Sequence, residues 1–113
     1  MVKIKRVYEP VSKRDGMRIL VDRIWPRGVK KEEARLDEWL REIAPSTALR
    51  KWFGHDPEKW PEFQEKYKEE LKSRAELIKS LKSEAKKKTV TLLFSARDKD
   101  QNQAVVLKEV LSK

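Results

Sequence analysis

Three segments of the chain carry the apolar pattern of β-strands. Residues 2–8 are rich in β-forming residues and modestly apolar, which predicts a strand. Residues 18–22 and 89–94 contain continuous apolar runs, as expected for strands of a parallel sheet that is covered on both faces. The connection 9–17 contains Pro10 and Gly16, which predict a loop or turn. Because this connection is short, the first two strands are either parallel or an antiparallel hairpin, and both arrangements stay open.

Apolar residues recur at steps of three and four in the rest of the sequence, which predicts amphipathic helices. The strongest pattern runs from Trp60 to Ala85, and Pro61 suits the first turn of that helix. Ser46 is a suitable cap for a shorter helix, which Gly54 would end. The predicted helices cover residues 32–44, 46–54, 61–88 and 103–111.

The order of these elements indicates the fold class. A long helical connection separates two buried strands, and such a connection is typical of a right-handed crossover between parallel strands. The sequence therefore predicts an α/β fold. We expect a small layered domain over residues 1–113, with a mostly parallel sheet of three or more strands flanked by helices.

Composition narrows the class of protein. A chain of 113 residues fits one domain, and its 4 Trp, 3 Phe and 2 Tyr distinguish it from a disordered tail. Cysteine is absent, which excludes disulfides and thiol catalysis. Neither a signal peptide nor a run of about 20 apolar residues is visible. We therefore expect a soluble, cytoplasmic protein with no membrane partner.

The formal net charge of +9 is concentrated at the two ends of the sequence. Residues 1–31 hold 10 basic and 3 acidic side chains, and residues 86–113 hold 7 and 3, whereas residues 32–85 hold 11 and 13. A basic surface attracts phosphates, so nucleic acid is one class of partner to consider. The abundance of Lys and Glu also matches proteins from hot environments, which accounts for part of the charge without any partner.

The segment after the second predicted strand carries the most informative chemistry. Asp22, Arg23 and Arg27 lie on a turn that Pro26 and Gly28 impose. Ligands of open α/β sheets bind outside the carboxyl ends of the strands. Arginine suits carboxylates and phosphates, and Asp22 is a candidate for orienting an arginine or holding a proton. A purely structural role, in which Asp22 pairs with a neighbouring arginine, is equally open.

The ends of the other two predicted strands add further candidates. Ser95 and Arg97 follow the third predicted strand, and Tyr8 ends the first. If the strand ends converge, Arg97 joins the arginines of the preceding turn in one anion-binding cluster. Most aromatic residues fall on apolar helix faces and are expected in the core, but Tyr8 and Trp25 do not. Both are therefore candidates for ligand contact.

His55 is the only histidine of the chain. Its side chain titrates near neutrality, which makes it a candidate proton donor beside Asp22 as a candidate base; a structural role in its turn is the alternative. One histidine without cysteine excludes the usual zinc ligand sets. The acidic residues from Asp98 to Glu109 partly match a calcium loop, but Gln103 stands where that loop needs glycine. We expect no metal and no cofactor.

Several specific blocks of sequence occur in order along the chain. They cover residues 21–28 (Val-Asp-Arg-Ile-Trp-Pro-Arg-Gly), 43–46, 49–57, 91–98 and 102–107. With these blocks the chain resembles the bacterial and archaeal YeaO-like family, a domain of unknown function numbered 488. The resemblance implies a small cytoplasmic α/β domain. It implies no reaction, because the family brings none that is established.

The sequence supports two functional hypotheses. In the first, Arg23, Arg27 and Arg97 hold a small phosphorylated or other anionic molecule at the strand ends, and whether the protein is also an enzyme stays open. In the second, the basic ends of the chain bind nucleic acid. A concave arginine cluster would favour the first hypothesis, and a broad lysine surface the second. A third reading is an interaction domain whose lysines only keep it soluble. The oligomeric state is not indicated.

Overall fold

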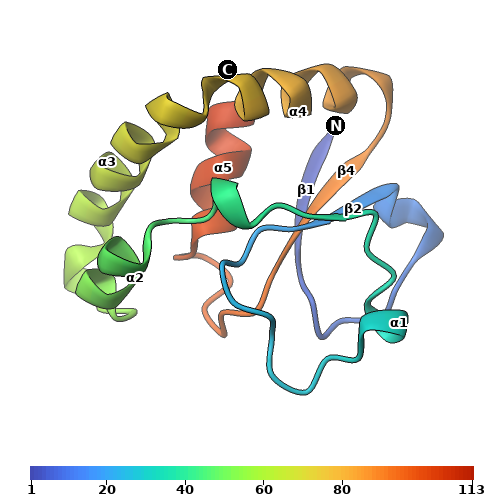
Figure 1. Ribbon diagram of the computed structural model, residues 1–113, viewed down its shortest axis with the longest axis horizontal. Coiled ribbons are helices and arrows are strands. Elements are labelled where there is room, and N and C mark those ends of the chain that lie inside the picture. Colours follow the sequence, from blue (N-terminus) through green and yellow to red (C-terminus); the bar gives the residue numbers. More distant parts are fainter.

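A sheet of four parallel strands forms the centre of the computed structural model, which describes residues 1–113 (Figure 1). Across the sheet, the strands are β1 (Val2–Arg6), β4 (Val90–Phe94), β2 (Met17–Leu20) and β3 (Glu38–Trp39). This arrangement confirms the predicted α/β fold with a parallel sheet. Since β1 and β2 both pair with β4, they do not form a hairpin with each other.

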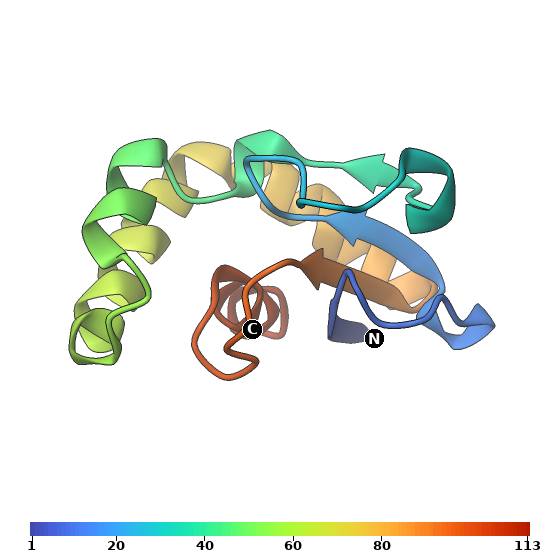
Figure 2. The same cartoon turned by 90° about the horizontal axis from the view of Figure 1, so that it is seen from below.

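Five α-helices accompany the sheet: α1 (Lys31–Ala34), α2 (Thr47–Phe53), α3 (Trp60–Leu71), α4 (Ala75–Lys87) and α5 (Gln103–Leu111). α3 and α4 form a long curved arm, and α5 lies inside its bend (Figure 1). α5 contacts β1 and β4 as well as both helices of the arm. Figure 2 shows α2 beside α3 at one end of the molecule, away from β1. None of the helices combines the length and apolar character that a membrane crossing requires.

Both faces of the sheet are covered, which explains the continuous apolar runs in β2 and β4. Ile19 and Leu92 belong to the large core that the sheet shares with the helices. Their neighbours Leu20 and Leu93 belong to a second, smaller core on the opposite face, because successive side chains of a strand point to opposite sides. The segment after β2 covers this second core with Trp25, Val29, Leu36 and Trp39.

The predicted helix over residues 32–44 is wrong. Its beginning forms only α1, which ends at Arg35 in the left-handed conformation with φ of 49°. Trp39 then lies in the edge strand β3, opposite Leu20 of β2. The apolar spacing that indicates a helix arises here from a short strand followed by the 3₁₀ turn η2 (Arg41–Ile43). Pairing with the edge of the sheet therefore overrides the local pattern.

The predicted long helix is present but interrupted. A 3₁₀ turn, η4 (Lys72–Arg74), separates α3 from α4. In this turn the Ser73 hydroxyl donates a hydrogen bond of 2.8 Å to the carbonyl of Glu70. Such back-bonding from a serine bends a helix, and the bend lets the arm follow α5.

The predicted caps of α2 are confirmed. The Ser46 hydroxyl accepts a hydrogen bond from the Leu49 N–H, and Gly54 ends the helix in the left-handed conformation. α5 is capped by Asn102, whose side-chain oxygen accepts from the N–H groups of residues 104 and 105. In the preceding loop, the Asp98 carboxylate accepts hydrogen bonds from the N–H groups of residues 100 and 101.

Candidate functional site

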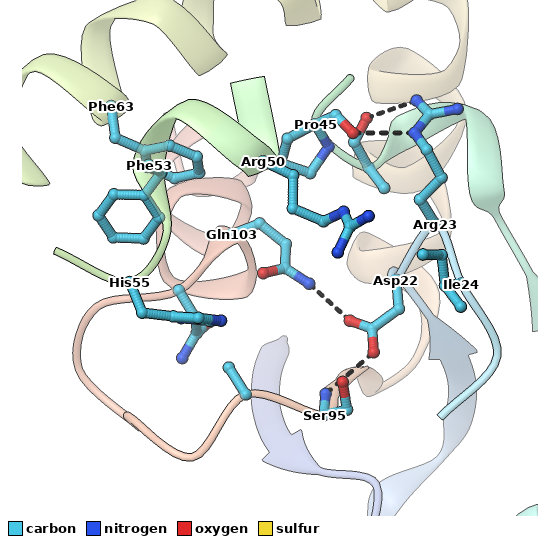
Figure 3. Close-up of a pocket in the computed structure, with 13 residues that line it drawn as sticks. Asp22, Arg23, Ile24, Pro45, Arg50, Phe53, His55, Phe63, Ser95 and Gln103 are labelled. Carbon is cyan, nitrogen blue, oxygen red and sulfur yellow. Dashed lines mark hydrogen bonds between the residues drawn. The ribbon is translucent and has the colours of Figure 1, made fainter. Parts of the chain in front are cut away.

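A pocket of about 140 Å³ opens beyond the carboxyl ends of β2 and β4 (Figure 3). The segments that follow these strands contribute Asp22 and Ser95, α2 contributes Arg50, and the turn after α2 contributes His55. The first residue of α5, Gln103, completes the polar lining. Since ligands of α/β sheets bind at this edge, the pocket is the candidate functional site. It brings together four residues that the sequence singles out: Asp22, Arg23, Ser95 and His55.

Asp22 forms the acidic part of the pocket. Its side-chain Oδ1 accepts a hydrogen bond of 2.6 Å from Gln103 Nε2, and Oδ2 accepts one of 3.1 Å from the Ser95 N–H. Burial raises the pKa of Asp22, while the hydrogen bonds from Ser95 and Gln103 and the charge of Arg50 oppose that rise. The fold therefore holds a carboxylate in a place that disfavours its charge, which is typical of functional sites.

Arg50 and His55 form the basic part of the pocket. Both side chains are exposed, and neither takes part in a hydrogen bond or an ion pair with the rest of the protein. His55 has a φ of 58°, in the left-handed region, directly after the glycine that ends α2. Few residues with a side chain adopt this region, so the turn after α2 gives His55 an uncommon backbone conformation.

An aromatic wall closes one side of the pocket. Phe53 and Phe63 are both buried, and their ring centroids lie 4.3 Å apart in a stacked arrangement. The His55 ring lies beside them, 5.9 Å from the ring of Phe53. This wall is part of the main core, so it is rigid and excludes water from one side of any bound molecule.

The pocket does not bring together the three arginines that the sequence singles out. Arg23 lines the pocket, but its guanidinium donates to the carbonyls of Ala44 and Pro45 at 3.0 and 2.9 Å and points away from Asp22 (Figure 3). Arg27 and Arg97 are exposed and lie outside the pocket lining. The Arg23 guanidinium binds there because the end of η2 leaves carbonyl groups that can accept its hydrogen bonds. A ligand-binding role for Arg27 and Arg97 stays a prediction.

Tyr8 and Trp25 also lie outside the pocket lining. The Tyr8 hydroxyl donates to the carbonyl of Arg27 at 2.9 Å. Trp25 packs edge-on against Trp39, with centroids 5.3 Å apart, and its indole N–H donates to the carbonyl of Val29 at 2.8 Å. Trp25 packs against the small core on the opposite face of the sheet, and Tyr8 contacts the same segment after β2 through Arg27. A role of either residue in ligand contact stays a prediction.

Sequence reasoning missed Arg50 and Gln103. Both lie on helices, where the apolar pattern marks the buried face and says nothing about which polar residue meets a strand end. A signal was available for Gln103, because it follows the polar loop after β4 and starts the next helix. Arg50 offers no such signal, since its position depends on how α2 packs against α3.

The comparison with known proteins identifies the family. The family described as "Inactive DUF488-N3 subclade" matches residues 1–113. The chain belongs to this family. It is 48% identical over 110 residues to the uncharacterized protein YeaO of Escherichia coli K12, which covers 97% of this chain and 96% of that protein. This similarity confirms the expected YeaO-like resemblance.

Mycobacterial relatives are less similar in sequence but also match over almost the whole chain. The chain is 40% identical over 111 residues to the uncharacterized protein Rv3073c of Mycobacterium tuberculosis, with 98% of this chain and 93% of that protein covered. The uncharacterized protein Mb3100c of Mycobacterium bovis matches to the same extent. No solved structure matches the chain.

The buried charge of Asp22 leads to a prediction on stability. We expect Asp22→Asn to be at least as stable as the parent protein at pH 7, because a raised pKa means that the fold favours the neutral form. If the Gln103 amide turns over, asparagine keeps both hydrogen bonds, one as acceptor and one as donor. Thermal unfolding at pH 7 tests this, and a clear drop in melting temperature would contradict it.

Proposed function

We propose that this protein binds a small anionic molecule in the pocket between β2, β4, α2 and α5, without catalysing a reaction on it. The observation that carries the proposal is the Arg50 guanidinium, which lines a concave site and has no partner within the protein. A planar guanidinium with free N–H groups is well suited to carboxylates and phosphates. His55 adds a second nitrogen donor to the same opening.

Two further observations favour binding over catalysis. Ser95 and His55 both line the pocket, yet no hydrogen bond joins the His55 ring to Ser95 or to Asp22, so the histidine is not paired with a nucleophile. The family that matches the whole chain is described as an inactive subclade. In this proposal Asp22 contributes negative charge to the site and does not transfer protons.

No observation favours the nucleic-acid hypothesis to the same degree. Several basic residues of the two ends form ion pairs within the protein instead of a free basic surface. The pairs are Lys5–Asp15, Arg18–Asp15, Lys88–Glu84 and Lys113–Glu109.

The replacement of Arg50 tests the proposal. We expect small anions such as propylphosphonate and butyrate, at millimolar concentration and low ionic strength, to raise the melting temperature of the parent protein. In Arg50→Ala the affinity should fall by at least about tenfold, because a charge-assisted hydrogen bond contributes roughly 1.5–3 kcal/mol. Calorimetric titration measures both affinities.

Lys51→Ala is the matched control. Lys51 is the next residue of α2 and is exposed like Arg50, but it does not line the pocket. Its loss removes the same charge from the same helix and should leave affinity within about twofold of the parent, since only screened long-range attraction changes. The proposal fails if no molecule with a phosphonate or carboxylate group binds, or if both variants weaken binding equally.

A further inference from the structure

The pocket is lined by side chains of opposite charge. Asp22 lies at the end of β2 and Arg50 on α2, and both side chains point into the cavity (Figure 3). They do not form an ion pair with each other, although the charge of Arg50 acts on the carboxyl of Asp22. An acid and a base that share a cavity without pairing leave room for a molecule between them.

Asp22 keeps hydrogen-bonding capacity for such a molecule. A carboxylate has about four acceptor sites, and the protein fills one on each oxygen, from Gln103 and from Ser95. The residue is 7% exposed, and this remaining surface lines the pocket. A ligand group that donates hydrogen bonds to Asp22 would therefore complete a site that the protein has partly built.

A ligand with a single charge fits this arrangement poorly. An anion bound at Arg50 would also face the carboxylate of Asp22, and the aromatic wall lowers the local dielectric and strengthens that repulsion. A cation at Asp22 would face Arg50 in the same way. Only a molecule with charge of both signs satisfies the two sides together.

The size of the pocket limits the molecule further. A volume of about 140 Å³ has room for roughly five to ten non-hydrogen atoms, on the basis of the space that waters need in cavities. Building on the proposed function, we propose that the ligand is a small zwitterion whose anionic group binds Arg50 and whose ammonium group binds Asp22. Its short aliphatic part contacts the wall of Phe53 and Phe63.

Pairs of isosteric probes test this inference directly on the intact protein. 2-Aminoethylphosphonate and propylphosphonate differ only in an ammonium group that replaces a methyl group, as do β-alanine and butyrate. We expect the ammonium member of at least one pair to bind at least about tenfold more tightly, which corresponds to the strength of a charge-assisted hydrogen bond. Calorimetric titration at pH 7 measures each affinity.

Asp22→Asn assigns the preference to this carboxylate. In the variant the preference for the ammonium member should disappear, while the anion-only member should bind as tightly as before or more tightly, because the repulsion is gone. Asp56→Asn is the control, since this carboxylate caps a nearby turn but does not line the pocket. It should keep the preference of the parent.

The outcomes separate the two proposals. Equal binding within each pair by the parent protein overturns the zwitterion and leaves the anion site in place. If no member of either pair binds, both proposals are overturned. A preference that survives in Asp22→Asn, or that disappears in Asp56→Asn, also overturns the assignment. Because the parent comparison needs no variant, the inference is tested even if Asp22→Asn fails to fold.

Discussion

Gly16→Ala should destabilise the fold by about 3 kcal/mol, combining backbone strain with a steric clash. Gly16 has a φ of 63° and a ψ of −129°, a combination that residues with a side chain rarely adopt. A Cβ at this position would lie 2.3 Å from the carbonyl oxygen of Thr89. The same oxygen accepts a hydrogen bond of 2.9 Å from the Met17 N–H, so it has no freedom to withdraw.

The change at Gly16 should also affect the candidate functional site, because β2 connects the two. Gly16 immediately precedes this strand, which ends two residues before Asp22. A shift at Gly16 disturbs the pairing of β2 with β4 that sets Asp22 against Ser95. Thermal unfolding should show a melting temperature lower by more than about 10 °C, as expected when a small domain loses about 3 kcal/mol.

Gly28→Ala provides the matched control. Gly28 also has a positive φ, 77°, but no atom lies within 4 Å of the point that a Cβ would occupy there. The control variant therefore bears the backbone strain alone, about 1 kcal/mol. If the two variants unfold at the same temperature, the contact with Thr89 is not the cause of the loss.

The sequence was sufficient to predict the two central strands of the sheet. The apolar runs of residues 18–22 and 89–94 predict buried parallel strands because both faces of β2 and β4 are covered. The sequence was not sufficient to predict β3. Glu38–Trp39 is too short to show the alternation of a strand, and its pairing with β2 defines it as one. The local apolar pattern predicts an element whose own residues show a clear signal. It misses a strand that exists only because it pairs with a neighbouring strand.

The same distinction applies to the candidate site. Asp22 and Ser95 meet because parallel neighbouring strands end at one edge, which the order of elements already implies. The direction of Arg23 depends on two carbonyls more than twenty residues further along the chain, and no local pattern reveals them. Arginine is long and flexible, so its position before or after a strand does not decide where its guanidinium lies.

Asp15→Asn should cost about 3 kcal/mol at pH 7, because it leaves a buried arginine without its counter-charge. Asp15 is 5% exposed and Arg18 is 3% exposed. The Asp15 carboxylate pairs with Arg18 and, at 3.0 Å, with Lys5 of β1. Arg18 in turn donates to the carbonyl of Ala34 at the end of α1. The carboxylate thus connects β1, β2 and the segment that covers the small core.

Glu62→Gln is the control for the loss of an ion pair as such. Glu62 pairs with Lys66 at 3.5 Å on the exposed surface of α3. Exposed pairs of this kind contribute at most about 0.5 kcal/mol within a helix. Urea unfolding of both variants at pH 7 should therefore separate a large loss from a negligible one, and similar losses would contradict the role of burial.

The pH dependence identifies the charge as the cause. Burial alone would raise the pKa of Asp15, but hydrogen bonds from the Ser12 N–H, Lys5 and Arg18 outweigh it, so the pKa lies below 3.8. A depressed pKa in the folded state means that the charged carboxylate stabilises the fold above pH 3.8 and that this stability is lost as the pH falls further. The difference between the parent and Asp15→Asn should therefore be complete at pH 7 and shrink below pH 3.8. A difference that persists unchanged in acid would show that shape, and not charge, holds these elements together.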